Sequence, residues 1–281
     1  MSIRIASLQN PKIKFAVSLQ KASVRKKEGL FLIEGIREIR LAMLSGYQFH
    51  TLFVCPSIIE NGTAGGPSGD PEIYSGAKDV IDILTGQVQI LETSRDVFRK
   101  LVYREGADGL LAVARQVRLS FSDLNQCGNP LVLVVESVEK PGNLGAILRT
   151  ADAAGVNAVL VCDSGTDIFN PNVVRSSLGT LFTVQIVCCS SKEAITWLKD
   201  MNIKIYTTAL TASTPYHLID YRGPSAIVAG TEATGVSAIW EDNSDANIII
   251  PMFGKVDSLN VSAAASIIIY EAIRQREITR F

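Results

Sequence analysis

Five polar side chains in the second half of the chain have the types and surroundings expected of a ligand-binding site. Asn143 and Arg149 stand in the stretch EKPGNLGAILRTADAAG, Glu232 in IVAGTEATGVS, and Ser258 and Asn260 in FGKVDSLNVSAAAS. Gly142 and Gly145 would let a ligand approach the start of the first helix, where unpaired N–H groups and the helix dipole attract anions. The two glycines would equally admit another backbone segment, so the pair by itself is a weak signal.

Each of these side chains also has a structural interpretation. Arg149 could form an exposed ion pair with Asp152. Like other surface ion pairs, it would contribute only about a few tenths of a kcal/mol to stability. Glu232 follows an apolar run, where a carboxylate caps a helix as readily as it binds a ligand. The apolar helix after the third stretch has four possible capping side chains, although one would suffice: Asp257, Ser258, Asn260 and Ser262.

Several kinds of chemistry lack the residues they need. The chain has two histidines, His50 and His217, so zinc sites and histidine-based triads have few available ligands or bases. The five cysteines are odd in number, show no C-x-x-C spacing and are predicted to be buried thiols. An oxidoreductase using a nucleotide cofactor is an alternative, but no G-x-G-x-x-G or P-loop motif is present.

Six apolar runs separated by helix-length segments must position the polar residues. They are apolar on both faces, as strands of a helix-covered parallel sheet are, and span residues 131–138, 157–163, 183–189, 203–210, 225–232 and 247–252. Ligands of such sheets bind beyond the carboxyl ends of the strands. All five candidate residues follow such ends, and Asn143 is expected to cap the helix after the first run.

The first part of the chain has a different pattern. Residues 29–35, 50–57 and 109–119 are predicted strands and residues 36–46 a helix, which indicates a small α/β domain over 1–119. Residues 60–71 form a turn-rich stretch predicted to be a mobile loop. Residues 120–130 lack periodicity and are predicted to link this domain to a second one, 131–281.

The net charge of −1 hides a gradient along the 281 residues. Residues 1–40 carry nine Lys or Arg and three Glu, whereas the rest of the chain has more acidic than basic residues. A local basic cluster favours a polyanionic partner, although a solvated helix end is an alternative. With 47% hydrophobic residues and no long uncharged apolar run or signal peptide, the chain is expected to be cytoplasmic, without a membrane partner.

The three stretches, taken in order, resemble the three motifs of the SpoU/TrmH family of SPOUT methyltransferases. The third motif extends through IPMFGKVDSLNVSAAASIIIYEAIRQR, and the resemblance covers about residues 131–276. It implies an α/β fold with a parallel sheet and a deep trefoil knot. More weakly, residues 1–119 resemble the ribosomal-protein-like substrate-binding domain of many members.

The resemblance also implies an activity, the transfer of a methyl group from S-adenosylmethionine to a ribose 2′-hydroxyl of RNA. The catalytic positions of the family match Asn143, Arg149, Glu232, Ser258 and Asn260. The cofactor contacts of the family, largely from backbone, match Ala209, Gly230, Ile250 and Leu259. Because the methyl donor is already a sulfonium, no metal is expected.

The partners implied by the resemblance are RNA and a second copy of the chain, with each site near the subunit interface. The basic first domain and the chain length favour large-subunit (23S) ribosomal RNA. Transfer RNA as the substrate, or a catalytically silent RNA-binding paralogue, are the alternatives. Since Arg149 is a poor free base, we expect it to clamp the target phosphate and stabilise the developing oxyanion.

Overall fold

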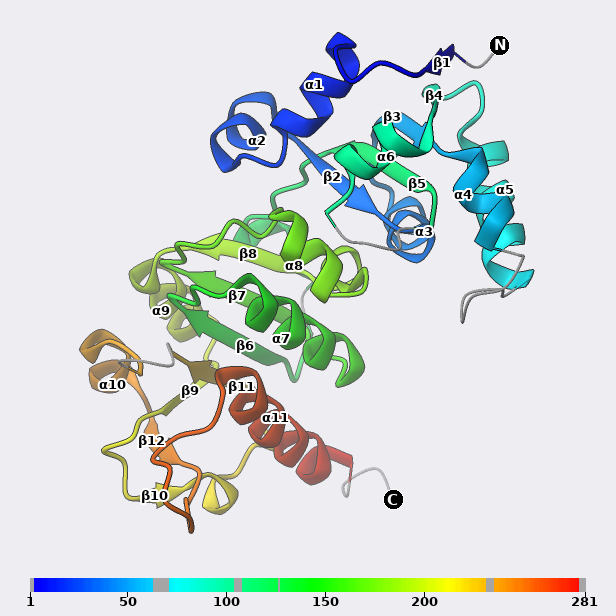
Figure 1. Ribbon diagram of the computed structural model, residues 1–281. Helices are drawn as coiled ribbons and strands as arrows, with labels where there is room; N and C mark the ends of the chain where they lie inside the picture. The colour runs from blue at the N-terminus through cyan, green and yellow to red at the C-terminus, as the bar shows by residue number, and fades with distance from the viewer. Residues whose placement is uncertain (1–2, 63–70, 104–107, 126, 231–234, 278–281) are drawn as a thin grey trace. The chain divides into compact units, whose positions relative to one another are not determined.

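The computed structural model of the protein describes residues 3–62, 71–103, 108–125, 127–230 and 235–277. The chain divides into two compact units (Figure 1). The first unit comprises Met1–Val117 together with Ile168–Thr183, and the second comprises Arg118–Asp167 together with Val184–Phe281.

The described strands of the first unit form one mixed sheet, in the order β1-β4-β3-β5-β2. Strands β1, β4 and β3 are parallel, and β5 runs antiparallel to both of its neighbours. The strands are β1 (Ile3–Ile5), β2 (Leu30–Glu34), β3 (Phe49–Val54), β4 (Gln89–Thr93) and β5 (Leu110–Arg115). The predicted strands correspond to β2, β3 and β5, whereas β1 and β4 escaped prediction.

The helices of the first unit follow ordinary local rules. In α3 the apolar residues Ile36, Ile39 and Ala42 recur on one face and are buried, as the predicted helix requires. Helix α6 begins after Ser94, whose hydroxyl accepts the Val97 N–H at 3.4 Å. The helices are α1 (Pro11–Ser18), α2 (Ala22–Glu28), α3 (Ile36–Leu44), α4 (Pro56–Gly62), α5 (Pro71–Leu84) and α6 (Arg95–Leu101).

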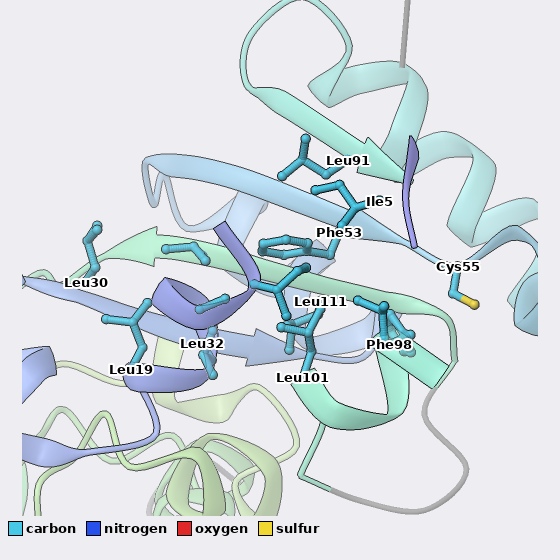
Figure 2. Packing of buried hydrophobic residues seen from close by; sticks show 14 residues of the cluster. Ile5, Leu19, Leu30, Leu32, Phe53, Cys55, Leu91, Phe98, Leu101 and Leu111 are labelled. Carbon is cyan, nitrogen blue, oxygen red and sulfur yellow. The ribbon is translucent and has the colours of Figure 1, made fainter. Parts of the chain in front are cut away.

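A hydrophobic core lies between one face of this sheet and helices α1 and α6. Figure 2 shows Phe53 and Leu111 from the sheet packed beside Leu101 and Phe98 of α6. Leu19, at the end of α1, is fully buried in the same cluster. Burial of such side chains is the main favourable contribution to folding, so this core contributes to the stability of the first unit.

The segment Ile168–Thr183 completes the first unit although it comes from the second half of the chain. It contains α8 (Pro171–Ser176) and the short 3₁₀ helix η2 (Thr180–Phe182). The ring of Phe169 lies 4.7 Å from that of Phe31 in β2, measured between centroids. The Phe182 ring lies 5.0 Å from that of Tyr47. These aromatic contacts pack the segment against β2 and against Tyr47.

The second unit is built on a sheet in which all described strand pairs are parallel, in the order β10-β12-β9-β11-β6-β7-β8. The strands are β6 (Leu131–Glu136), β7 (Ala158–Cys162), β8 (Ile186–Cys189), β9 (Lys204–Thr208), β10 (Thr214–Pro215), β11 (Ser225–Ala229) and β12 (Ala246–Ile249). The six predicted runs correspond to all of these except the two-residue β10. The predicted α/β class with a parallel sheet is therefore confirmed.

Helices cover both faces of this sheet, as Figure 1 shows, with α7 and α11 side by side on one face and α9 on the other. They are α7 (Pro141–Ala153), α9 (Ser191–Asp200), α10 (Ala238–Asn243) and α11 (Val261–Glu277), with the 3₁₀ turns η1 (Phe121–Asp123) and η3 (Tyr216–Leu218). Leu198 and Trp240 pack against Val134, Leu160 and Val228 in a buried cluster. Burial on both faces explains why the strands are continuously apolar.

Of the two helix starts with predicted caps, one differs from the prediction and the other agrees in part. Helix α7 begins at Pro141, after Lys140, so Asn143 lies in its first turn and is not the cap. Proline is favoured at a first helical position because its missing N–H would have no partner there. At α11 the cap is Asn260, whose Oδ1 accepts the Ser262 N–H at 3.0 Å. The Ser258 hydroxyl donates to Asp257 at 3.4 Å, and the capping bond to the first turn is made by Asn260 and not by Ser258.

The segment predicted as a linker packs on the second unit. The ring of Phe121 stacks on that of Trp197 with centroids 5.2 Å apart. The boundaries 1–119 and 131–281 stay a prediction, as does the trefoil knot. Most of the predicted mobile loop lies outside the described residues. None of the described helices is long and apolar enough to cross a membrane.

The five cysteines are free thiols, but only some are buried as predicted. Cys55 and Cys162 are buried, whereas Cys127 and Cys188 are exposed. The sulfur atoms of Cys162 and Cys189 lie 3.7 Å apart on neighbouring strands. The hydrogen bond with Cys189, reinforced by burial, raises the pKa of the Cys162 thiol, which therefore stays protonated near neutral pH.

Candidate active site

A pocket opens at the carboxyl ends of β9, β11 and β12, beside the start of α11. Because parallel strands end at the same edge of the sheet, the residues that follow them meet there. The lining is mostly apolar side chains and backbone: Thr208, Ala209, Leu210, Ala229, Gly230, Gly235, Ile248, Ile249, Ile250, Met252, Asp257, Ser258, Leu259, Val261 and Ala264. Such a surface can enclose the faces of a flat heteroaromatic ligand.

All four positions predicted to contact a cofactor line this pocket. Ala209 follows β9, Gly230 follows β11, Ile250 follows β12, and Leu259 precedes α11. Ser258, one of the predicted catalytic residues, lines it as well. Residues that are widely separated in the sequence are thus brought to one place by the strand order.

Gly230 is a position where the backbone closes tightly on itself. A Cβ atom built on Gly230 would lie 2.3 Å from the carbonyl carbon of Gly235, so a larger residue could not fit without movement. Gly235 itself has a φ of 69°, in the left-handed region that favours glycine. Both ends of the segment that carries Glu232 are therefore in contact. Glu232 itself lies outside the described residues.

Two of the predicted catalytic residues are joined directly. The side-chain amide of Asn260 donates to Oδ1 of Asn143 across 3.3 Å, linking the start of α11 to the start of α7. The same Asn260 caps α11 through its Oδ1. One side chain therefore fixes the helix start and the position of a second polar group, which explains the polar run before an apolar helix.

Arg149, like Asn143 and Asn260, is a predicted catalytic residue that lies outside the pocket lining. It is exposed on α7, six residues beyond Asn143. At about 100° per residue, the two side chains leave the helix in directions differing by roughly 120°. A hydrogen bond of 2.8 Å between the hydroxyls of Thr150 and Ser266 ties the same turn of α7 to α11. The Arg149 guanidinium thus projects from a fixed helix and remains accessible.

The sequence analysis missed residues that the structure places at this edge. Asp257 lines the pocket as a carboxylate, and its position directly before Ser258 could have suggested it. Glu136 ends β6 and accepts hydrogen bonds from Ser237 and Ser191. A lone charge at the end of the apolar run LVLVVE was the available signal. In the described ranges, no group of three or more His, Cys, Asp or Glu side chains is placed to hold a metal ion.

Comparisons with known proteins agree with this architecture. The SpoU rRNA methylase family model matches residues 130–270, and a model described as an MRM3-like substrate binding domain matches residues 10–112. The 23S rRNA (guanosine(2553)-2′-O)-methyltransferase RlmP of Bacillus subtilis is 31% identical over 267 residues, which are 95% of this chain and 98% of that protein. The chain belongs to the SpoU rRNA methylase family.

Solved structures of SpoU relatives share the fold over almost the whole chain. A crystal structure of an RNA 2′-O ribose methyltransferase has a TM-score of 0.81 at 35% identity, covering 98% of this chain and all (100%) of that one. The SpoU methyltransferase AviRb from Streptomyces viridochromogenes, solved in complex with the cofactor AdoMet, has a TM-score of 0.82 at 26% identity, covering 96% and 100%. Membership of the SpoU family leaves the oxidoreductase interpretation without support.

Proposed function

We propose that the protein transfers a methyl group from S-adenosylmethionine to the 2′-hydroxyl of a ribose in 23S ribosomal RNA. The observation that carries this proposal is the convergence of Ala209, Gly230, Ile250 and Leu259 in one pocket. The relatives named above are 2′-O-methyltransferases, and RlmP acts on 23S rRNA. The residues of the pocket and the family membership thus both support ribose 2′-O-methylation.

The pocket fits the cofactor by the character of its walls. Ile248, Ile250 and Leu259 offer apolar surface for the adenine ring, and the backbone of Gly230 and Gly235 forms part of the same wall. Asp257 adds a negative charge to the wall, which suits a cationic ligand. When bound, S-adenosylmethionine supplies an activated methyl group on a sulfonium, so positioning does most of the remaining work.

Arg149 acts on the RNA in this proposal. A ribose hydroxyl must lose its proton during attack, and a guanidinium is always charged at neutral pH, so Arg149 cannot serve as an ordinary base. It clamps the phosphate next to the target ribose and stabilises the developing oxyanion, and the phosphate shares the proton. Its exposed position on α7 leaves it free to meet a large substrate.

Asn143, Ser258 and Asn260 hold the reacting groups in place. Asn260 connects the two helix starts, and its hydrogen bond to Asn143 fixes the position of that amide. Ser258 contributes a hydroxyl in the pocket wall. Glu232 is assigned to the same catalytic group on its match to the second family motif.

The first domain binds the RNA. Its basic residues Lys12, Lys14, Lys26 and Lys27 are exposed on α1 and α2, where they can neutralise phosphates. The match of residues 10–112 to a substrate-binding domain supports this role. We retain the predicted division into an RNA-binding domain at 1–119, a linker at 120–130 and a methyltransferase domain at 131–281, which carries the knot.

The protein works as a cytoplasmic homodimer in this proposal. Arg149 does not line the pocket of its own chain, so a second copy can bring its own residues to complete each site. Helix α11 supports this arrangement, because Tyr270 is 49% exposed and directly follows the small and apolar stretch 263–269. Sedimentation equilibrium would detect the dimer. A cytoplasmic location is consistent with a ribosomal RNA substrate.

Transfer of a radiolabelled methyl group tests the function. Purified protein and labelled S-adenosylmethionine are incubated with total RNA from a strain that lacks the gene, and the RNA is then separated by size. We expect label in the large ribosomal RNA and none with Arg149→Ala. Label in transfer RNA would contradict the substrate, and absence of both label and cofactor binding would favour a silent RNA-binding paralogue.

A further inference from the structure

Glu136, the last residue of β6, is a buried carboxylate with only 5% of its surface exposed. The five residues before it in the strand are all Leu or Val. Burial of a carboxylate is costly unless hydrogen bonds replace its lost water. A carboxylate kept at this place therefore needs specific partners, and these partners indicate what it does.

The partners of Glu136 come from two other elements. Its Oε2 accepts the backbone N–H of Ser237 at 2.7 Å, and its Oε1 accepts the hydroxyl of Ser237. Oε1 also accepts the hydroxyl of Ser191, at the start of α9, at 3.1 Å. The Ser191 oxygen in turn accepts the indole N–H of Trp240 at 2.9 Å. The carboxylate thus ties β6 to the starts of α9 and α10.

Ser237 stands two residues beyond Gly235, which lines the candidate cofactor pocket. The backbones of Gly230 and Gly235 are in contact, as the position of a Cβ on Gly230 shows. Gly230 is held by β11, whose last residue, Ala229, directly precedes it. On the other side, the backbone bond to Glu136 anchors the chain just after Gly235.

We propose that Glu136 is a positioning residue for the cofactor pocket. By accepting two hydrogen bonds from Ser237, its carboxylate holds Gly235 against Gly230 and so sets the shape of the wall that both glycines form. Glu136 is not among the residues lining the pocket and acts through the backbone that it anchors. The identity of the ligand rests on the proposed function, whereas the anchoring does not.

The test compares two replacements of Glu136. Glu136→Met has a similar volume but accepts no strong hydrogen bond, so it releases Ser237. Glu136→Gln keeps one carbonyl oxygen for the Ser237 N–H, and its amide can donate to the serine hydroxyls after they rotate. We expect Glu136→Met to raise the dissociation constant for S-adenosylmethionine about tenfold, measured calorimetrically on folded protein, and Glu136→Gln to restore most of the affinity.

A matched control is available on α9. Glu193 accepts the backbone N–H of Ser190 at 2.8 Å and its hydroxyl at 2.7 Å, the same pair of donors, but it is exposed and belongs to a helix cap. Glu193→Met should leave cofactor affinity unchanged. Ser237→Ala removes the hydroxyl but retains the backbone N–H bond to Glu136. If the two bonds share the anchoring, this change should raise the dissociation constant for S-adenosylmethionine about two- to threefold.

Amide hydrogen exchange at Ser237 gives a readout that does not depend on the cofactor. It should accelerate in Glu136→Met and stay slow in Glu136→Gln and Glu193→Met. If Ser237→Ala and a folded Glu136→Met bind as tightly as wild type, the proposal is wrong. Equal loss in the Gln and Met variants would also overturn it, because charge and not hydrogen bonding would then matter. Failure of the wild-type protein to bind would instead contradict the proposed function.

Discussion

Arg149 and Gly230 illustrate what single residues contribute to this site. Arg149 is an exposed cation on a helix that is fixed by its packing against α11, whereas Gly230 is a buried position without room for a side chain. Arg149 acts through its positive charge and its long side chain, whereas Gly230 allows a close backbone contact because it has no side chain. Different substitutions therefore test them.

For Arg149, the replacements by Ala and Lys separate charge from shape. Removing a group that stabilises charge in a transition state typically lowers kcat by about 10²–10³-fold, and we expect this for Arg149→Ala. Arg149→Lys keeps a positive charge without the planar fork, so measurable activity should remain. The measurement is kcat at saturating cofactor and RNA. Equal losses in the two variants would show that point charge alone is not the role of Arg149.

For Gly230, replacement by Ala should disturb the pocket. The added Cβ would lie 2.3 Å from the Gly235 backbone, so the backbone at residue 230 and the backbone at Gly235 must move apart. Such overpacking costs about 1–3 kcal/mol of folding free energy, and we expect cofactor affinity to fall with it. Equilibrium binding and urea denaturation measure both effects. Gly223→Ala is the control, because nothing lies within 4 Å of the added atom there; if Gly230→Ala behaved like this control, the close approach would have no functional consequence.

At the scale of elements, hydrophobic pattern predicted most of the second unit. The six long apolar runs became β6, β7, β8, β9, β11 and β12, since strands buried on both faces leave a strong signal. Strand β10 has only two residues, and β1 only three, which is too short for any period. The first residues of the helices were harder to predict, because several neighbouring polar side chains could each have been the cap. Helix α7 begins at Pro141, and α11 begins after its cap, Asn260.

Asn260 can be tested as both a cap and a site residue. Asn260→Asp keeps the oxygen that caps α11 but loses the amide donor to Asn143, so stability should hold while activity falls. Asn260→Ala loses both functions and should also cost about 1 kcal/mol of folding free energy. Urea denaturation and methyl transfer are measured in parallel. Full activity in Asn260→Asp would show that the Asn143 contact is dispensable.

At the scale of the whole molecule, the structure groups Ile168–Thr183 with the first unit, although the SpoU family match covers this segment. The sequence TDIFNPNVVRSSLGTLFT shows apolar residues that must be buried, but periodicity does not say against which partner. The same limit applies to the pocket: spacing identified the strand ends, while the strand order β12-β9-β11-β6 had to come from the structure. The family resemblance supplied the chemistry that geometry alone leaves open.

Phe169 tests whether this segment stabilises the first unit. It is fully buried against Phe31, and Phe→Ala substitutions in cores cost about 3–5 kcal/mol. Phe169→Ala should therefore lower the midpoint of thermal or urea unfolding and increase proteolysis within the first unit. Phe253→Ala is the matched control, because Phe253 is 96% exposed. Similar unfolding midpoints for the two variants would argue against a stabilising role for the segment.

A 2′-O-methyltransferase must place the methyl group on the ribose and not on a base. Alkaline hydrolysis decides this directly, because RNA cleavage needs the free 2′-hydroxyl as the internal nucleophile. After labelling 23S rRNA with radioactive S-adenosylmethionine, we predict that the label survives in an alkali-resistant dinucleotide and is absent with Arg149→Ala. Label released in mononucleotides would place the methyl group on a base and contradict the central claim.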